Sequence, residues 1–273
     1  MLIFTSDKKR LRQHFEKDNV LFAYHLGDLD DFHFEHCQWA ATYGRSPRID
    51  DVILTYTGLE TPTVLAFGLS ERFGDLLDGM LDLFPERFHC HFQEMSRDIF
   101  LRRYKENPLG THLKMKLAGL NPVLPADDRC IVRLGHVHEQ QLRTLYAVAY
   151  PDNYFDSRML ATGKYFGYLA DDRPHADDRL HADDRLQAVA GVHVCSDEYN
   201  VAALGNITTH PDHRGKGFAA ALTSHLTAEL VDEGKLVCLN VKADNLPAIR
   251  CYEKLGFEVV HEHEEALFDL KSL

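Results

Sequence analysis

The sequence predicts an α/β (α+β) protein made of two compact domains, and three observations lead to this expectation. The chain has 273 residues, and at roughly 100–200 residues per domain this length favours two domains. A composition break with two prolines and two acidic residues, at 119–128, separates two patterned regions. Both regions mix strand-like and helix-like patterns. We therefore expect domains at 1–120 and 129–273, joined by a linker at 121–128.

The first region contains several strand-like runs and one helical run. Residues 51–56 and 63–67 predict the strands of a hairpin, and apolar residues recur at helical spacing over 72–84. Further strands are expected at 88–92 and 112–117. This half is therefore expected to be α/β or α+β.

The second region begins with the same mixture. A strand is expected at 130–134, a helix at 138–149 and a short helix near 155–161. Two apolar strands follow, at 165–169 and 188–195.

The connection between those two strands holds three copies of Ala-Asp-Asp-Arg, at 170–173, 176–179 and 182–185. A period of six residues is far shorter than the 20–50 residues of a solenoid repeat. We expect a hairpin loop that a duplicated hexapeptide has lengthened, because loop entropy rises slowly with loop length. The alternative is a metal-binding or partner-binding role for its Asp and His side chains.

Composition excludes several classes of protein. Hydrophobic residues make up 45% and charged residues 26% of the chain, which is ordinary for a folded globular protein. A formal net charge of −12 argues against a nucleic-acid partner, which needs clustered Lys and Arg. There is no apolar run of about 18 residues and no signal-peptide pattern, so we expect a cytoplasmic protein without a membrane partner. The six cysteines form no C-x-x-C pair, and reduced thiols are expected.

A long helix follows a β-rich stretch that begins at residue 200. Phe218, Leu222, Leu226 and Leu230 recur every four residues, which predicts one apolar stripe that packs on a sheet. A strand, a Gly-containing turn and a helix start together gather unpaired backbone N–H groups at the positive end of a helix dipole. Such a place favours a phosphate or a pyrophosphate.

The turn itself has the residue types that this chemistry needs. Gly215 and Gly217 allow positive φ and a close approach of the chain to an anion, and Arg214 and Lys216 add positive charge. Two glycines between basic residues are also compatible with an ordinary strand-to-helix turn.

A second segment strengthens the phosphate interpretation. Residues 235–241 predict a strand, and a short helix follows it. Asn245 stands at the helix start, Pro247 in its first turn, and Gly256 where a left-handed C-terminal cap belongs.

Together these two segments resemble the GNAT superfamily of N-acyltransferases. The family signature Gln/Arg-x-x-Gly-x-Gly/Ala is matched at every fixed position by Arg214-Gly215-Lys216-Gly217-Phe218-Ala219. The run from Asn245 to Phe257 is similar to the second conserved block of the family, with an Asn near the helix start and Tyr252 inside the helix. The resemblance covers about residues 129–273.

This resemblance implies a GNAT-like fold, with a mixed, mostly antiparallel central sheet flanked by helices, and an acetyl-CoA or acyl-CoA cosubstrate without a metal. Tyr252 matches the family's general acid, which protonates the departing thiolate; packing on a short amphipathic helix is the alternative role. The implied cofactor-binding residues are Ile207, Thr208, Thr209, Arg214, Gly215, Lys216, Gly217, Phe218, Ala219 and Asn245.

The general base is less clear from the sequence. Many relatives carry a Glu in the strand before the cofactor loop, but residues 201–207 contain no acidic side chain. His193, Glu198 and Asn206 are the nearby candidates, and a water chain is another. An amine that arrives neutral needs none of them.

The N-terminal half resembles, more distantly, the first part of tandem GNAT proteins related to the glycine N-acyltransferase-like group, through residues 21–32 and the hairpin and helix after them. It lacks the Arg-x-x-Gly-x-Gly signature. We expect a degenerate GNAT-like domain that has lost cofactor binding and shapes the acceptor site or an interface.

Three histidine-rich runs, at 33–37, 89–91 and 261–263, could in principle bind a metal. A metal site needs three or four convergent ligands, and the sequence does not show which run would partner another. Surface or core histidines are therefore expected, and no metal.

The expected function is transfer of an acetyl group from acetyl-CoA to a primary amine, on a small molecule or a protein, by direct attack. The alternative is a catalytically silent CoA-binding sensor or structural protein, which the missing Glu favours. A monomer or a homodimer is expected.

Overall fold

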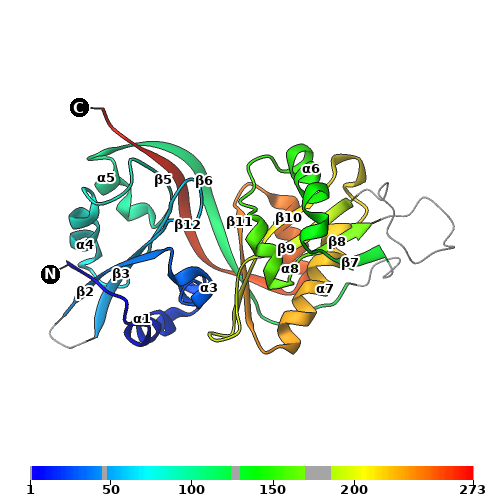
Figure 1. Ribbon diagram of the computed structural model, residues 1–273, viewed down its shortest axis with the longest axis horizontal. Helices are drawn as coiled ribbons and strands as arrows, with labels where there is room; N and C mark the ends of the chain where they lie inside the picture. The colour runs from blue at the N-terminus through cyan, green and yellow to red at the C-terminus, as the bar shows by residue number, and fades with distance from the viewer. Residues whose placement is uncertain (1, 45–47, 124–129, 170–185, 273) are drawn as a thin grey trace. The chain divides into compact units, whose positions relative to one another are not determined.

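The structure is a computed structural model, and it describes residues 2–44, 48–123, 130–169 and 186–272 (Figure 1). The chain divides into two compact units. Unit 1 comprises Met1–Met115, Asn240–Leu246 and Val259–Leu273, and unit 2 comprises Lys116–Leu239 and Pro247–Glu258. This grouping differs from the predicted boundaries, because the end of the chain returns to the first unit. The linker at 121–128 stays a prediction.

Unit 1 is built on a mixed sheet with the strand order β1-β2-β3-β4-β5-β12-β6. Its strands are β1 (Leu2–Phe4), β2 (Cys37–Tyr43), β3 (Ile49–Tyr56), β4 (Thr63–Ala66), β5 (Arg87–Phe92) and most of β6 (Tyr104–Leu117) and β12 (Phe257–Leu270). Its helices are α1 (Lys8–Phe15), α2 (Ala23–Asp28), α3 (Asp31–Phe34), α4 (Phe73–Met80) and α5 (Arg97–Phe100). The predicted hairpin is confirmed, since β3 pairs with β4 in antiparallel register.

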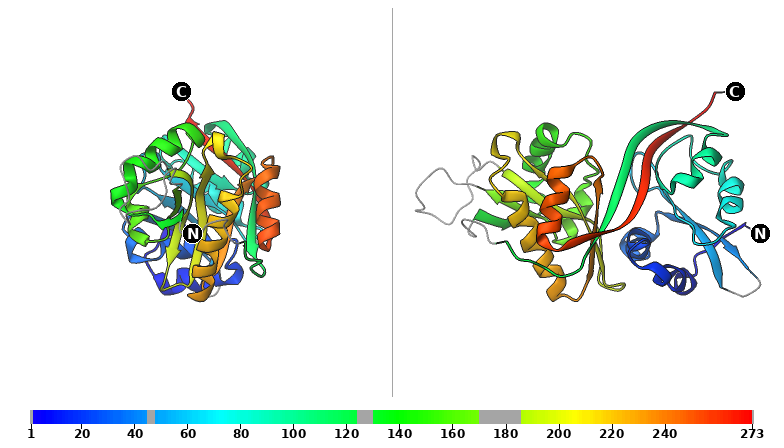
Figure 2. Two further views of the ribbon diagram at one scale, coloured as in Figure 1. Left: turned by 90° about the vertical axis from the view of Figure 1, so that its right-hand side faces the viewer. Right: turned by 180° about the vertical axis from the view of Figure 1, so that it is seen from behind.

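Unit 2 has the strand order β11-β10-β9-β8-β7. Its strands are β7 (Ile131–Arg133), β8 (Phe166–Leu169), β9 (Leu186–Ser196), β10 (Val201–Thr209) and most of β11 (Leu236–Lys242), and its helices are α6 (Glu139–Ala149), α7 (Phe218–Asp232) and α8 (Leu246–Leu255). The short helix expected near 155–161 is a 3₁₀ helix, Ser157–Thr162. Helix α6 lies on one face of these strands, and α7 and α8 lie on the other (Figure 2).

The two units repeat one arrangement. In unit 1, β1 to β4 pair antiparallel, and β4 then pairs in parallel with β5 across helix α4. In unit 2, β7 to β10 pair antiparallel, and β10 then pairs in parallel with β11 across helix α7. The predicted mixed, mostly antiparallel fold, present twice in tandem, is confirmed.

Helix α7 packs as its sequence predicts. Leu222, Leu226 and Leu230 are fully buried, and burying each such side chain stabilises the fold by about 1.5–3 kcal/mol. The β8–β9 hairpin forms, but its connection with the three Ala-Asp-Asp-Arg copies lies outside the described residues.

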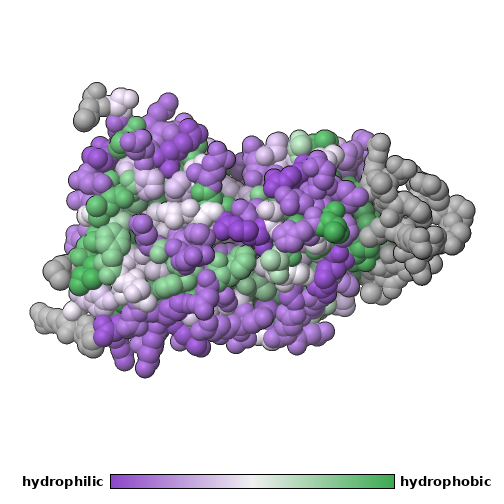
Figure 3. Space-filling view, viewed as in Figure 1, coloured by the Kyte–Doolittle hydropathy of each residue, from purple (hydrophilic) through white to green (hydrophobic). Residues whose placement is uncertain are grey.

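The surface is mostly polar on the face that Figure 3 draws, with apolar residues in smaller groups. Within the four described ranges, we find no helix of the length and hydrophobicity that crossing a bilayer requires. The cellular location stays a prediction.

Candidate active site

Strand β10 brings the predicted residues of unit 2 to one end of its sheet. The strand pairs with β11 over Val201–Leu204 and continues along β9 as far as Thr209. Its register with β9 shifts between Gly205 and Thr208, and Asn206 has a φ of 55°. A bulge of this kind redirects the chain, and it lies directly before Ile207.

The turn after β10 has the backbone geometry that the glycine pattern predicts. Gly215 and Gly217 have φ values of 78° and 82°, in the region that favours glycine. Gly217 is the N-cap of α7, whose first intrahelical bond runs from Ala221 N–H to Gly217 C=O, 3.0 Å. Among the described residues, the backbone N–H groups of 215–220 have no hydrogen-bond acceptor. The 15-residue helix therefore presents a set of free donors at its positive end.

The side chains of this turn hold it in place or stack beside it. The guanidinium of Arg214 donates to the carbonyls of Thr209 (3.5 Å) and Ala149 (3.4 Å). The ring of Phe218 stacks on Tyr168 with centroids 4.0 Å apart. Residues 214–217 are exposed, whereas 218 and 219 are partly buried. The turn is thus anchored at both ends and open to a ligand between them.

Tyr252 lies in the middle of α8. Its side chain is buried, and its ring packs edge-on against Phe257. Burial is the main cause that raises the pKa of its phenol, and the nearby Cys251 and Tyr150 raise it further. The phenol is therefore protonated at neutral pH. Its hydroxyl has no hydrogen-bond partner in the described part of the chain, but it is not enclosed. A protonated, unengaged phenol is a suitable proton donor.

A tyrosine network that the sequence did not indicate fixes the bulge in β10. Tyr146 on α6 donates its hydroxyl to the carbonyl of Asn206, 2.8 Å. The amide of Asn206 donates to the hydroxyl of Tyr165 (2.9 Å), which donates to the carbonyl of Val192 (3.0 Å). Burial raises the pKa of both phenols. Such a network holds the Asn206 backbone in its left-handed conformation.

The three candidate bases have different surroundings. Asn206 is buried and its amide serves the tyrosine network. Glu198 is exposed in the β9–β10 turn, at the opposite end of β10 from Thr209. His193 is partly buried, and its ring lies against Gly205, where a side chain would overlap it. The ring of Tyr154 approaches it at 6.4 Å. Of the three, His193 is the titratable side chain beside the bulge.

Asn245 lies in the turn between β11 and α8, next to the first residue of the helix, and it is exposed. This is the local position that the second conserved block predicts. Its contact with a cofactor stays a prediction.

Unit 1 has a turn between β4 and α4 that corresponds to residues 210–217 of unit 2. In unit 1, side chains of the same unit accept hydrogen bonds from the backbone N–H groups of this turn. The buried carboxylate of Asp51 accepts from the N–H groups of Leu69 (2.9 Å) and Ser70 (3.1 Å). The side-chain carbonyl of Gln93 accepts from Gly68 N–H, 3.1 Å. No glycine of this turn has a positive φ. The chain itself supplies the anion here, which fits the expected loss of cofactor binding in this half.

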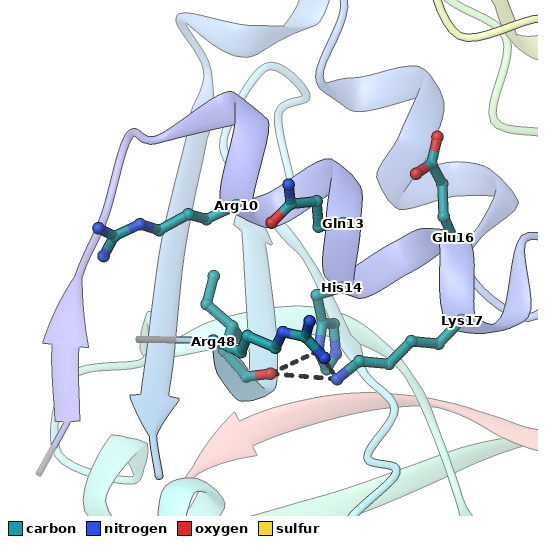
Figure 4. Close-up of a pocket in the computed structure, with 7 residues that line it drawn as sticks. Arg10, Gln13, His14, Glu16, Lys17 and Arg48 are labelled. Carbon is teal, nitrogen blue, oxygen red and sulfur yellow. Dashed lines mark hydrogen bonds between the residues drawn. The ribbon is translucent and has the colours of Figure 1, made fainter. Parts of the chain in front are cut away.

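A surface pocket on unit 1 involves none of the predicted residues (Figure 4). Lys17 donates to the carbonyl of Ile49 at 3.1 Å, and His14 Nδ1 lies 3.3 Å from the same oxygen. Burial lowers the pKa of His14 to about 4. The basic groups around this pocket thus already serve packing within the unit.

The fold, with a helix that follows the fourth strand and begins at free backbone N–H groups, is of the GNAT type, and comparisons with known proteins agree with this class. The family described as FR47-like protein matches residues 184–266. This range contains both the turn before α7 and Tyr252.

Two curated relatives match a short part of this chain. The mycothiol acetyltransferase of Corynebacterium aurimucosum is 42% identical over 53 residues, which is 19% of this chain. The [ribosomal protein bS18]-alanine N-acetyltransferase of Escherichia coli is 44% identical over 57 residues, or 20% of this chain. The matches span 17% and 38% of the length of these relatives.

Solved structures share the fold over most of the chain. A putative acetyltransferase from the GNAT family of Novosphingobium aromaticivorans has a TM-score of 0.59 at 22% identity, covering 81% of this chain and 89% of that one. A tandem GNAT protein from the clavulanic acid biosynthesis pathway has a TM-score of 0.55 at 13% identity, covering 98% of each chain. The family match, the relatives and the shared fold confirm the predicted resemblance to the GNAT superfamily.

Proposed function

We propose that the protein is an acetyl-CoA-dependent N-acetyltransferase that acts on a primary amine by direct attack. The observation that carries this proposal is the set of unpaired backbone N–H groups at 215–220, at the start of α7. These donors would bind the pyrophosphate of CoA, with Ile207 to Thr209 along the pantetheine arm and Asn245 in contact with it.

The proposed chemistry is a nucleophilic substitution at the thioester carbon. The amine nitrogen forms a bond to the carbonyl carbon and gives a tetrahedral oxyanion, which a backbone N–H near Ile207 would stabilise. The carbon–sulfur bond then breaks, and the leaving thiolate takes the proton of Tyr252. Thiol and phenol have reference pKa values of about 8.5 and 10, and burial raises the pKa of Tyr252 further, so the phenol keeps its proton until negative charge develops on the departing sulfur.

In this proposal His193 takes the proton that the amine loses, directly or through a water. Its ring lies beside Gly205, next to the bulge that precedes Ile207. The acceptor is an amine of a small molecule or of a protein. The name of the E. coli relative gives a protein alanine as acceptor for that enzyme.

The direct test is release of free thiol from acetyl-CoA in the presence of pooled primary amines and of protein acceptors. We expect thiol release that depends on an amine, together with mass-spectrometric detection of the acetylated product. Tight acetyl-CoA binding without thiol release for any acceptor would contradict the enzyme and favour the CoA-binding sensor.

His193→Gln is expected to lower kcat/KM by about 100-fold near pH 7, which is the usual contribution of a general base. The loss should shrink as the pH approaches the amine pKa, about 10.4 for a lysine-like amine, because the amine then arrives neutral. Steady-state rates from pH 6 to 10 measure this. His225→Gln, at an exposed histidine on α7 of the same unit, should match wild type. A loss that is equal at every pH would assign His193 to packing.

A further inference from the structure

Three histidines and one glutamate that are distant in the sequence converge in unit 1. His91 lies on β5, His112 on β6, and His263 and Glu265 on β12, in a sheet where β12 stands between β5 and β6. Glu265 is directly opposite His91 in the antiparallel register. His263 and Glu265 share a face because alternate residues of a strand point the same way.

The donor atoms of these side chains lie close together. Glu265 Oε1 is 3.1 Å from His91 Nδ1 and 3.1 Å from His263 Nε2. Glu265 Oε2 is 3.5 Å from His112 Nε2. Donor atoms of His91, His263 and Glu265 all lie within 4.8 Å of one another. The three rings form a stack, with His263 between His91 and His112 at centroid distances of 5.5 and 5.8 Å.

The cluster is removed from water. The side chains of His263 and Glu265 are 1% and 7% exposed, and those of His91 and His112 are 14% and 12% exposed. Two members are therefore nearly enclosed, while the other two leave a path by which an ion could enter.

These donors match the requirements of a zinc ion. Zinc prefers imidazole nitrogen and carboxylate oxygen at about 2.0–2.2 Å in tetrahedral geometry, which places neighbouring donor atoms about 3.3 Å apart. The distances of 3.1 Å from Glu265 Oε1 to His91 Nδ1 and to His263 Nε2 are close to this value, and His112 Nε2 lies 3.5 Å from the other oxygen of Glu265. Calcium and magnesium prefer oxygen ligands, so they suit this donor set poorly.

We propose that His91, His263 and Glu265, with His112 as the fourth donor, bind a zinc ion that ties strand β12 to β5 and β6. Because β12 comes from the end of the chain, the ion would link residues more than 150 positions apart and close a long loop, an arrangement that stabilises a fold. Its role is structural, and it is independent of the proposed transferase activity.

The side chain of Lys114 interacts electrostatically with His91 and His263 and provides the competing explanation. Lys114 is buried, and its ammonium lies 4.7 Å from the ring centre of Tyr24. If Lys114 alone balanced the charge of Glu265, the cluster would be an internal ion-pair network without a metal. The test must therefore detect the ion itself.

The experiment uses the full chain, untagged and stripped with a chelator, titrated with zinc chloride in calorimetry and in thermal unfolding. We expect one zinc per chain and a melting temperature that rises with zinc concentration, because an ion that binds only the folded state stabilises it by mass action. Cobalt(II) in the same site should give the visible absorption of a tetrahedral complex without a thiolate charge-transfer band. Such a band would place the ion on cysteines and overturn the proposal.

Ligand variants complete the test. His263→Ala and His91→Gln should weaken zinc binding by at least about 100-fold, more than the 10–100-fold loss typical of residues that only orient a ligand. His261→Ala is the matched control, since His261 shares the strand and face but pairs with Asp18 at 3.0 Å. It should keep wild-type affinity. Circular dichroism checks that each variant folds. If His263→Ala does not fold, the test uses His91→Gln, which changes the more exposed ligand. The proposal is overturned if the ligand variants bind zinc with the same affinity as wild type, or if wild type binds no zinc.

Discussion

Gly217→Val is expected to raise the dissociation constant of CoA at least tenfold, a loss of about 1.4 kcal/mol or more. Gly217 is the N-cap of α7 at a φ of 82°, where a side chain costs roughly 1–2 kcal/mol of strain. A Cβ there meets no protein atom within 4 Å. It would project from the turn into the space beside the unpaired N–H groups, where we propose that the pyrophosphate binds. Calorimetry at low salt measures the affinity.

The chain provides a matched control at the other end of the same helix. Gly234 follows the C-cap of α7 with a φ of 75°, and a Cβ there also meets no atom within 4 Å. Gly234→Val should therefore lower the free energy of unfolding by about as much as Gly217→Val, but leave the CoA affinity unchanged. An equal loss of affinity in both variants would mean that helix stability, and not the turn, explains the effect. Unchanged affinity in Gly217→Val would refute the proposed cofactor site.

The helix and the turn of this site were predictable because their signals are local. The four-residue spacing of Leu222, Leu226 and Leu230 depends only on helix geometry, and all three are buried as predicted. The two left-handed glycines depend only on local backbone sterics. Both are properties of a short segment, so one sequence was sufficient.

The features that sequence reasoning missed depend on contacts between distant segments. The charged run 257–270 forms strand β12, which pairs with β5 in the first unit, and no local pattern specifies that partner. For the same reason, the sequence does not show which of the histidine runs lie together, and this pairing brings His91 and His263 together. The tyrosine network around Asn206 likewise joins residues of α6, β9 and β10.

The two turns differ in how their backbone N–H groups are bonded, and this difference fits our proposal that a fold present twice binds CoA in unit 2 alone. Each unit places a turn and a helix after its fourth strand, and each turn must satisfy the free donors at the helix start. In unit 1 the carboxylate of Asp51 accepts hydrogen bonds from the backbone N–H groups of Leu69 and Ser70, in the turn before α4. In unit 2 the backbone N–H groups of 215–220 have no such acceptor among the described residues. The differences include buried Asp51 and the side chain of Gln93 as acceptors in unit 1, and the spacing of these residues in the sequence does not reveal them.

Tyr252→Phe is expected to lower kcat by about 100- to 1,000-fold, within the usual range for loss of a general acid, while the KM for acetyl-CoA stays within about twofold. The ring that packs on Phe257 is kept, so the variant should fold with wild-type stability. Burial raises the pKa of this phenol, so the wild-type acid stays protonated well above neutral pH, and the loss should persist across the neutral range. A decrease confined to kcat indicates an interaction made only in the transition state.

Steady-state kinetics with acetyl-CoA and the best amine measure this effect, and Tyr199→Phe, at a partly buried tyrosine in the β9–β10 turn, is the control. The hydroxyl of Tyr252 has no partner in the described part of the chain, so removing it breaks no hydrogen bond there. Any large effect on kcat must then come from the reaction itself. A kcat within threefold of wild type would assign Tyr252 to packing and leave proton donation to solvent.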